Sequence, residues 1–208
     1  VPALRLQEKL VARAGEADDL VFHRRAIARP DAGDNLLEEG RTVQVRGQQR
    51  RGRLVGVRNP TRELFDAEPR AGEIEMITDG EKAGADGQYV ELGPGAQHIT
   101  IDLRSKHVIC AVLFWHYRKQ ARVYDDVAVQ VADDSDFISG VGTLCNNDHD
   151  NSAGLGIGKD MNYVETAEGK LIDMQGVETR YVRLYSNGND ANALNHDVEV
   201  EVFGKPVK

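Results

Sequence analysis

The segments QHITIDL, residues 97–103, and HVICAVLFWHY, residues 107–117, decide the fold class of this protein. In the first segment Ile99, Ile101 and Leu103 alternate with polar residues, which is the period of a half-buried β-strand. The second segment opens with an almost unbroken apolar run, which is typical of a strand covered on both faces. The two segments predict strands in the interior of a β domain.

The same period of two continues on both sides of these segments. Gly, Asn and Asp clusters separate the further alternating runs, and hardly any helical spacing occurs after Glu73. Many strands with almost no helix favour an antiparallel sandwich or barrel. The further runs are VYDDVAVQV (123–131), TRYVRLY (179–185) and DVEVEVF (197–203).

Two segments are too long and too polar to be simple turns. They are residues 146–162 (NNDHDNSAGLGIGKDMN) and residues 186–197 (SNGNDANALNHD). Loops of this length on a β scaffold are often functional, so we expect binding residues on them.

The first part of the chain differs from the rest. Residues 2–14 carry apolar side chains at roughly helical spacing between a Pro and a Gly, which predicts an amphipathic helix. Residues 41–57 alternate around a basic turn, which predicts a hairpin. We therefore expect an N-terminal extension or small accessory subdomain at residues 1–72 and a β-sandwich at residues 73–208.

Charge and composition argue against nucleic acid as a partner and against a membrane span. The extension holds 14 basic and 11 acidic residues, whereas residues 73–208 hold 12 basic and 23 acidic residues. An acidic main domain is a poor binder of phosphate backbones, so nucleic acid is not expected as a partner. No segment approaches the roughly 18 apolar residues of a membrane helix, so no membrane span is expected.

The two cysteines leave two interpretations open. Cys110 and Cys145 lie in apolar contexts and form no CxxC pair, which argues against a redox motif or a zinc site. They are either buried free thiols, which we favour, or a disulfide.

The order of motifs in the β region resembles the discoidin or coagulation-factor type C domain. This family belongs to the galactose-binding-like jelly rolls, and the similarity covers residues 74–205. It rests on six pieces in the family's order: ITDG (77–80), ITIDL (99–103), an apolar strand that ends in Phe114 and Trp115, DVAVQVADD (126–134), RYVRL (180–184) and EVEVFG (199–204).

The resemblance implies a function as well as a fold. It implies an all-β, antiparallel β-sandwich of the jelly-roll type in an exported protein, which is secreted, periplasmic or at the cell surface. The expected role is that of a non-catalytic binding module that recognises a glycan or a cell-surface polymer. The alternative is a structural or interaction domain that contacts neighbouring domains or subunits without a small ligand.

The resemblance also implies one structural Ca²⁺ ion, where the Asp-Gly turn meets the last strand. The matching side chains are Asp79 and Glu199. A hard cation takes six to eight oxygen ligands, so main-chain carbonyls are expected to complete the set. The Thr and Trp that usually follow the turn are missing here, and Asp86 is the candidate for the lost oxygen. The remaining expected ligands are the carbonyls of Met76 and Val198, with Glu81. In the alternative, Asp79 only caps a turn and Glu199 is exposed.

A second acidic segment also offers oxygens at alternating spacing. Asn146, Asn147, Asp148 and Asp150 are either ligands of a second Ca²⁺ ion or an ordered Asx-rich turn. The segment lacks the Gly and Glu positions of an EF-hand loop, so the turn is the favoured interpretation.

In this family the loops at one end of the sandwich hold the ligand, and an aromatic ring often lies against the sugar. Trp115 is either such a ring or part of the core, which is the commoner role. His116 and Arg118 are expected as an exposed polar pair. An aromatic ring of this kind can stack on a sugar, while amides, His and Arg side chains can hydrogen-bond its hydroxyls. The full candidate set is Trp115, His116, Tyr117 and Arg118 with Tyr124 opposite, and His149, Asn187, Asn189, Asn192 and His196 from the two long loops.

No enzyme motif is present. HExxH, GxSxG, P-loop and dinucleotide fingerprints are missing from the sequence. The segment GLGIGK at residues 154–159 lacks the final Ser or Thr of a P-loop. A hydrolase with paired carboxylates is the last of the three hypotheses.

Overall fold

The computed structural model describes residues 7–14, 20–27, 55–56, 62–65 and 68–208 of the 208-residue chain. It divides the chain into two units, residues 1–54 and residues 55–208.

In the first unit, the described residues form two antiparallel strands. β1 (Gln7–Ala14) pairs with β2 (Leu20–Ile27) along the whole length of both strands. The helix predicted for residues 2–14 is therefore wrong where the structure describes that segment. Pairing with a partner strand is a non-local interaction, and it overrides the helical spacing of a short segment. The hairpin predicted at residues 41–57 lies outside the described residues, apart from Val55–Gly56.

In the described part of the second unit, the regular secondary structure consists of strands and one short 3₁₀ helix. Its first two strands lie before residue 73, at residues 55–56 and 62–65, and both pair with strands of the main sheet. These strands therefore belong to the same unit as the sandwich. The elements are β3 (Val55–Gly56), β4 (Arg62–Phe65), η1 (Ile74–Thr78), β5 (Val90–Leu92), β6 (Gln97–His116), β7 (Ala128–Ala132), β8 (Gly142–Asn146), β9 (Lys170–Ser186) and β10 (Asn195–Pro206).

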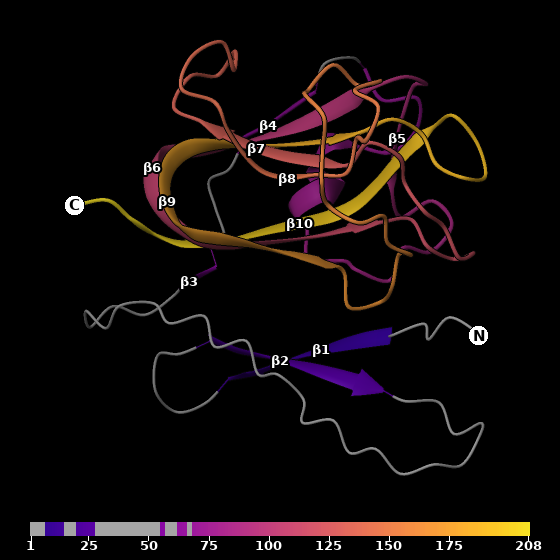
Figure 1. The fold of residues 1–208 in the computed structure, drawn as a ribbon, viewed down its shortest axis with the longest axis horizontal. Coiled ribbons are helices and arrows are strands. Elements are labelled where there is room, and N and C mark those ends of the chain that lie inside the picture. Colours follow the sequence, from indigo (N-terminus) through magenta and orange to yellow (C-terminus); the bar gives the residue numbers. More distant parts are fainter. Residues whose placement is uncertain (1–6, 15–19, 28–54, 57–61, 66–67) are drawn as a thin grey trace. The chain divides into compact units, whose positions relative to one another are not determined.

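Two long strands build both layers of the sandwich. The strand order is β3-β10-β6-β9-β7-β8, with β4 beside β6 and β5 beside β10. The first part of β6 pairs with the last part of β9, and the last part of β6 pairs with the first part of β9. β4 and β7 extend the first of these pairings, whereas β10 extends the second. Figure 1 shows the two layers, which β6 and β9 connect as they curve round together.

The bend of β6 and β9 has a local cause. Arg104, Gln175 and Gly176 have positive φ values of 66°, 53° and 74°. The register between the two strands shifts twice: from Asp102 to His107, where Arg104 lies, and from Ile109 to Ala111, opposite Gln175 and Gly176. The two segments at residues 97–103 and 107–117 are therefore one strand with a bend, because a strand can change layers at such an irregularity.

The core lies between the two layers. Ile99 and Ile101 from the first part of β6 and Phe114 from its last part are buried there with Val129 and Val182. A smaller cluster forms around Trp115, Tyr117 and Val198. The prediction of an all-β, antiparallel β-sandwich is confirmed.

Candidate functional site

Three loops meet at one end of the sandwich. They are the β6–β7 loop (residues 117–127), the β8–β9 loop (147–169) and the β9–β10 loop (187–194). Main-chain hydrogen bonds join them: the Asn147 N–H donates to the Val127 carbonyl at 3.1 Å, and the Asn187 N–H donates to the Asp125 carbonyl at 2.9 Å. The long polar segments seen in the sequence are therefore neighbours in space.

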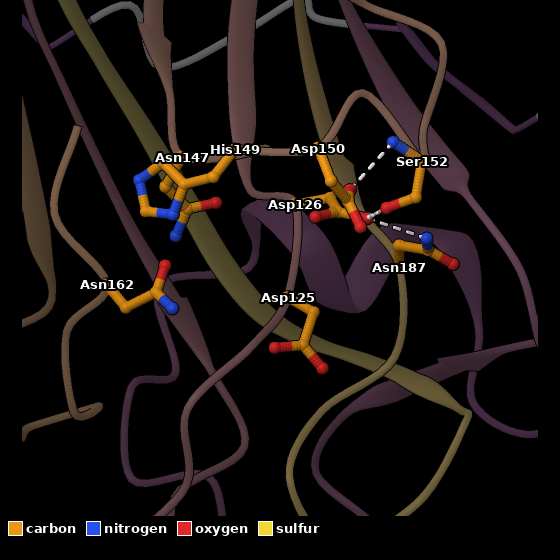
Figure 2. A pocket seen from close by; sticks show the side chains of 8 residues that line it. All are labelled: Asp125, Asp126, Asn147, His149, Asp150, Ser152, Asn162 and Asn187. Atoms are coloured by element: carbon orange, nitrogen blue, oxygen red, sulfur yellow. Dashed lines mark hydrogen bonds between the residues drawn. The ribbon is translucent and has the colours of Figure 1, made fainter. Parts of the chain in front are cut away.

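An open pocket of about 390 Å³ lies among these loops. All of its lining side chains are polar, and none belongs to Lys, Arg or a Phe, Tyr or Trp ring. Figure 2 shows Asn147, His149 and Asn162 on one side of the pocket, and Asp126 and Asp150 with Ser152 and Asn187 on the other. The lining residues are Asp125, Asp126, Asn147, His149, Asp150, Ser152, Asn162 and Asn187.

Hydrogen bonds fix the carboxylate side of the pocket. Asp126 Oδ2 accepts from Ser152 Oγ and from Asn187 Nδ2, each at 2.7 Å. Asp150 Oδ1 accepts from the Ser152 N–H at 3.0 Å. One carboxylate, that of Asp126, therefore links all three loops.

The side-chain amide of Asn147 lines the pocket but makes no hydrogen bond within the described part of the chain. Its side chain is only 3% exposed, and neither Nδ2 nor Oδ1 has a hydrogen-bond partner in the described part of the chain. Figure 2 shows its amide beside His149 and facing Asn162. Each buried polar group without a partner costs about 1–3 kcal/mol. A ligand that supplies a donor and an acceptor would remove that cost.

Only part of the predicted ligand set lies at this pocket. His149 and Asn187 line it, as expected of the two long loops. Asn189 is buried and donates to Asn192 Oδ1 at 3.2 Å and to the Leu194 carbonyl at 2.8 Å, so both asparagines shape their own loop.

The other predicted ligand residues lie in the interior of the sandwich. Trp115 is buried and donates its indole N–H to the Ala167 carbonyl at 3.0 Å, which favours the core interpretation. His116 is 1% exposed, so the prediction of an exposed pair with Arg118 is wrong. Arg118 is partly buried and donates to the Lys82 carbonyl. Tyr117, Tyr124 and His196 are also buried.

His116 belongs to a buried network of charges. Its Nδ1 lies 2.7 Å from Glu165 Oε1 and its Nε2 lies 3.5 Å from Asp197 Oδ1, while its ring stacks on Tyr124 at 4.2 Å. Burial lowers the pKa of His116, but the Glu165 and Asp197 carboxylates outweigh burial and hold this pKa above its ordinary value. Burial raises the pKa of Asp197 to about 6. His116, Glu165 and Asp197 are all buried, so the network offers no access to a ligand.

Two of the expected calcium ligands meet at the Asp-Gly turn. Glu199 Oε2 accepts from the Gly80 N–H at 3.0 Å, and Glu199 is 2% exposed, so its exposed alternative is wrong. Burial, together with the nearby charges of Asp79 and Glu201, raises the pKa of Glu199 to about 7. Asp79 is exposed and accepts from the Glu81 N–H at 2.7 Å, as a turn cap does. A buried carboxylate beside a second carboxylate fits a hard cation.

The remaining expected calcium ligands are placed differently. Met76 lies in η1 just before the turn, and Val198 is buried next to Glu199 in β10. Glu81 accepts from the Ala83 N–H at 2.7 Å. Asp86 instead accepts from the Tyr117 hydroxyl at 2.9 Å and pairs with Lys119, so its carboxylate already has two partners.

Several residues of the pocket were not predicted as ligands. Asp125 and Asp126 immediately precede an apolar strand, and Asn162 ends the long polar segment, so their positions at loop ends are the signal that was available. Ser152 carries no such signal. Cys110 and Cys145 are free thiols, which settles the choice between the two interpretations.

No protein family model matches the chain, and no curated protein matches its sequence. Solved structures do match it. One is a family 89 glycoside hydrolase from Clostridium perfringens, with a TM-score of 0.58 and 15% identity over 74% of this chain. A second is the CBM32 module of AlyQ in complex with 4,5-unsaturated mannuronic acid, with a TM-score of 0.51 and 16% identity over 68% of this chain and 93% of the module.

A third is CBM32-1 from a family 31 glycoside hydrolase of Clostridium perfringens, with a TM-score of 0.53 and 12% identity over 69% of this chain and 93% of the module. The chain has the discoidin-like fold of CBM32 carbohydrate-binding modules. This CBM32-like chain spans 15% of the length of the family 89 hydrolase that it matches. Within the described residues, no helix is long and apolar enough to cross a bilayer.

Proposed function

We propose that this protein is a non-catalytic module that binds a glycan or a cell-surface polymer as part of a larger exported protein, which is secreted, periplasmic or at the cell surface. The observation that carries the proposal is the buried Asn147 amide, which lines the loop pocket with both of its polar atoms unpartnered. The CBM32-like fold supports it, because one of the similar modules is described in complex with a sugar acid.

The chemistry of the pocket fits a sugar. An amide presents a donor and an acceptor side by side, so Asn147 can hydrogen-bond two neighbouring hydroxyl groups of one ring. Asn162, His149 and the carboxylates add further donors and acceptors. The His149 imidazole is the only ring among the lining residues, so hydrogen bonds rather than stacking would provide most of the affinity and specificity.

A glycan array followed by calorimetry on the full chain tests this function. Asn147→Ala should abolish binding of the best glycan, whereas Gln120→Ala should not change it. Gln120 is a matched control because it is exposed, also ends in an amide and lies on the β6–β7 loop outside the pocket lining. Unchanged binding by Asn147→Ala, with wild-type thermal stability, would contradict the proposal.

We also propose a structural Ca²⁺ ion held by Asp79 and Glu199, with carbonyl oxygens of Met76 and Val198 and with Glu81 as further donors. The buried Glu199 beside Asp79 supports this assignment, since a cation would offset the cost of two close carboxylates. Such an ion would tie the Asp-Gly turn to β10. Calorimetric titration of Asp79→Ala and Glu199→Ala with Ca²⁺ tests it, and wild-type affinity in both variants would refute the assignment.

A second candidate function is an interaction domain for neighbouring domains or subunits. Large apolar side chains are exposed on the β7–β8 and β8–β9 loops, namely Ile138, Ile157 and Met161. Contiguous exposed apolar patches mark contact surfaces, whereas single exposed apolar side chains are common on any protein surface. A silent glycan array together with a stable oligomer on gel filtration would favour this function over the first.

A further inference from the structure

Three carboxylates converge beside the pocket. Asp126 precedes β7, while Asp148 and Asp150 follow β8, and one oxygen from each lies within 4.8 Å of the others. Asp148 is completely buried, at 0% exposure, whereas Asp126 and Asp150 line the pocket. This is the spacing of oxygens that share one metal ion, since Ca²⁺–oxygen distances are about 2.3–2.6 Å.

Neutral groups alone satisfy this cluster within the described part of the chain. Asp148 accepts from the main-chain N–H groups of Ser152 and Ala153, each at 3.0 Å. Asp126 accepts from the side chains of Ser152 and Asn187, and Asp150 accepts from the Ser152 N–H. None of the ion pairs among the described residues involves one of the three carboxylates. Like charges this close repel each other, and a cation bound between them would offset this repulsion.

The Asn147 amide is a second, independent indication of a ligand at the same place. Asn147 is adjacent to Asp148 in the sequence and lines the same pocket as Asp126 and Asp150, with both polar atoms unpartnered. Figure 2 shows this amide and the carboxylates on facing sides of one pocket. An occupant of the pocket would therefore have a charged region and a hydroxyl-binding region available to it at once.

We infer that Asp126, Asp148 and Asp150 bind a Ca²⁺ ion, distinct from the ion of the Asp-Gly turn, and that this ion takes part in glycan recognition. Three side chains supply only part of the six to eight oxygens that Ca²⁺ requires. Because Asp126 and Asp150 line the pocket, the remaining positions are open to hydroxyl oxygens of a glycan, while Asn147 hydrogen-bonds a neighbouring hydroxyl. The recognition step rests on the proposed function, whereas the cation site does not.

Calcium titration of the full chain, without glycan, tests the cation site. Asp126→Asn and Asp150→Asn should each weaken one class of Ca²⁺ binding by at least about tenfold, because ligand charge sets the affinity of such sites. Each change is also made in a Glu199→Ala background, which removes the turn site, so that the remaining binding is assigned to the pocket. Glu178→Gln is the control, since Glu178 is exposed on β9 outside the pocket. Wild-type titrations of both Asp variants would overturn the cation site.

Glycan binding in Ca²⁺ and in EDTA tests the role in recognition. The expected result is loss of binding in EDTA for wild type and for Glu199→Ala, and intact Ca²⁺ binding without glycan binding for Asn147→Ala. Full glycan affinity in EDTA would overturn the recognition role and leave the proposed function standing. A glycan array that is silent with Ca²⁺ present contradicts the proposed function and the recognition role together, while the titration alone still decides the cation site.

Discussion

At the scale of single residues, the His116 imidazole and the Glu199 carboxylate are buried, although side chains of these types are fully buried less often than apolar ones. His116 and Glu199 are both buried, and each lies next to other ionisable groups. Burial of a charge without compensation is costly, so each residue should leave a measurable mark on stability. Their sequence contexts, an aromatic strand end and an alternating strand, do not distinguish these environments.

We expect His116→Ala to destabilise the protein by about 3–5 kcal/mol, because it leaves Glu165 and Asp197 as unpaired buried carboxylates. His149→Ala should leave stability nearly unchanged, since His149 is exposed in the β8–β9 loop, and should weaken glycan binding instead. Urea unfolding of both variants measures the contrast. Equal stability of the two variants would contradict the buried network.

Glu199 should make stability depend on pH in the absence of Ca²⁺. Its pKa in the folded state is about 7, above the ordinary value of 4.5, so folding favours its protonated form. Its contribution is present below pH 4.5 and is lost as the pH rises to about 7. In EDTA, Glu199→Gln should therefore be more stable than wild type at pH 8, and this difference should shrink at pH 5.

Thermal unfolding at the two pH values measures this difference. Ca²⁺ should reverse the ranking at pH 8, because the ion binds the ionised carboxylate and Gln offers no charge. A Tm difference that does not change with pH would show that Glu199 titrates normally.

At the scale of elements, the start of β9 depends on close packing over Trp115. Gly169 has a φ of 74°, and a Cβ atom there would lie 2.5 Å from Trp115 Cε2 and 2.9 Å from the Phe114 carbonyl oxygen. Gly87 has a similar φ of 80°, but nothing lies within 4 Å of a Cβ atom at that position. The two glycines thus separate the cost of backbone conformation from the cost of a clash.

Gly87→Ala should destabilise the protein by about 1 kcal/mol, which is the cost of a positive φ for a residue with a Cβ atom. Gly169→Ala should cost at least about 2 kcal/mol more, because the clash with the indole and the main chain is added. Chemical unfolding of both variants provides the comparison. Equal losses would show that the contact with Trp115 relaxes without cost.

At the scale of the whole molecule, the position of the N-terminal boundary of the sandwich decides which fragment of the chain should fold stably. β4 pairs with β6 from Arg62↔Asp102 to Phe65↔Ile99, and β3 pairs with β10. A fragment of residues 55–208 keeps both strands, whereas a fragment of residues 73–208 loses them and exposes the edge of β6. Exposed edges weaken a sheet and promote association.

We expect residues 55–208 to unfold at the same temperature as the full chain and to retain Ca²⁺ binding. Residues 73–208 should unfold at a lower temperature and aggregate more readily. Calorimetry and light scattering on the two fragments measure both properties. Loss of folding in the longer fragment would show that the first unit is needed for the sandwich.

The sequence by itself determined the class of the fold and the positions of several of its strands. Alternation in residues 97–103 and the apolar run after them are local patterns, and burial of one or both faces of a strand follows directly from them. The same reading identified the two long loops that carry the pocket. The helix predicted at residues 2–14 was wrong because the partner strand β2, not the local spacing, decides the conformation of Gln7–Ala14.

Only the tertiary structure decided which of the candidate side chains reach a ligand. Trp115 and His116 look like binding residues at a strand end, yet packing against the second cluster and the carboxylates buries them. Asp126 meets Asn187 although 61 positions separate them in the sequence. Side-chain direction and the meeting of distant loops follow from how the two layers bend and close, which local periodicity does not encode.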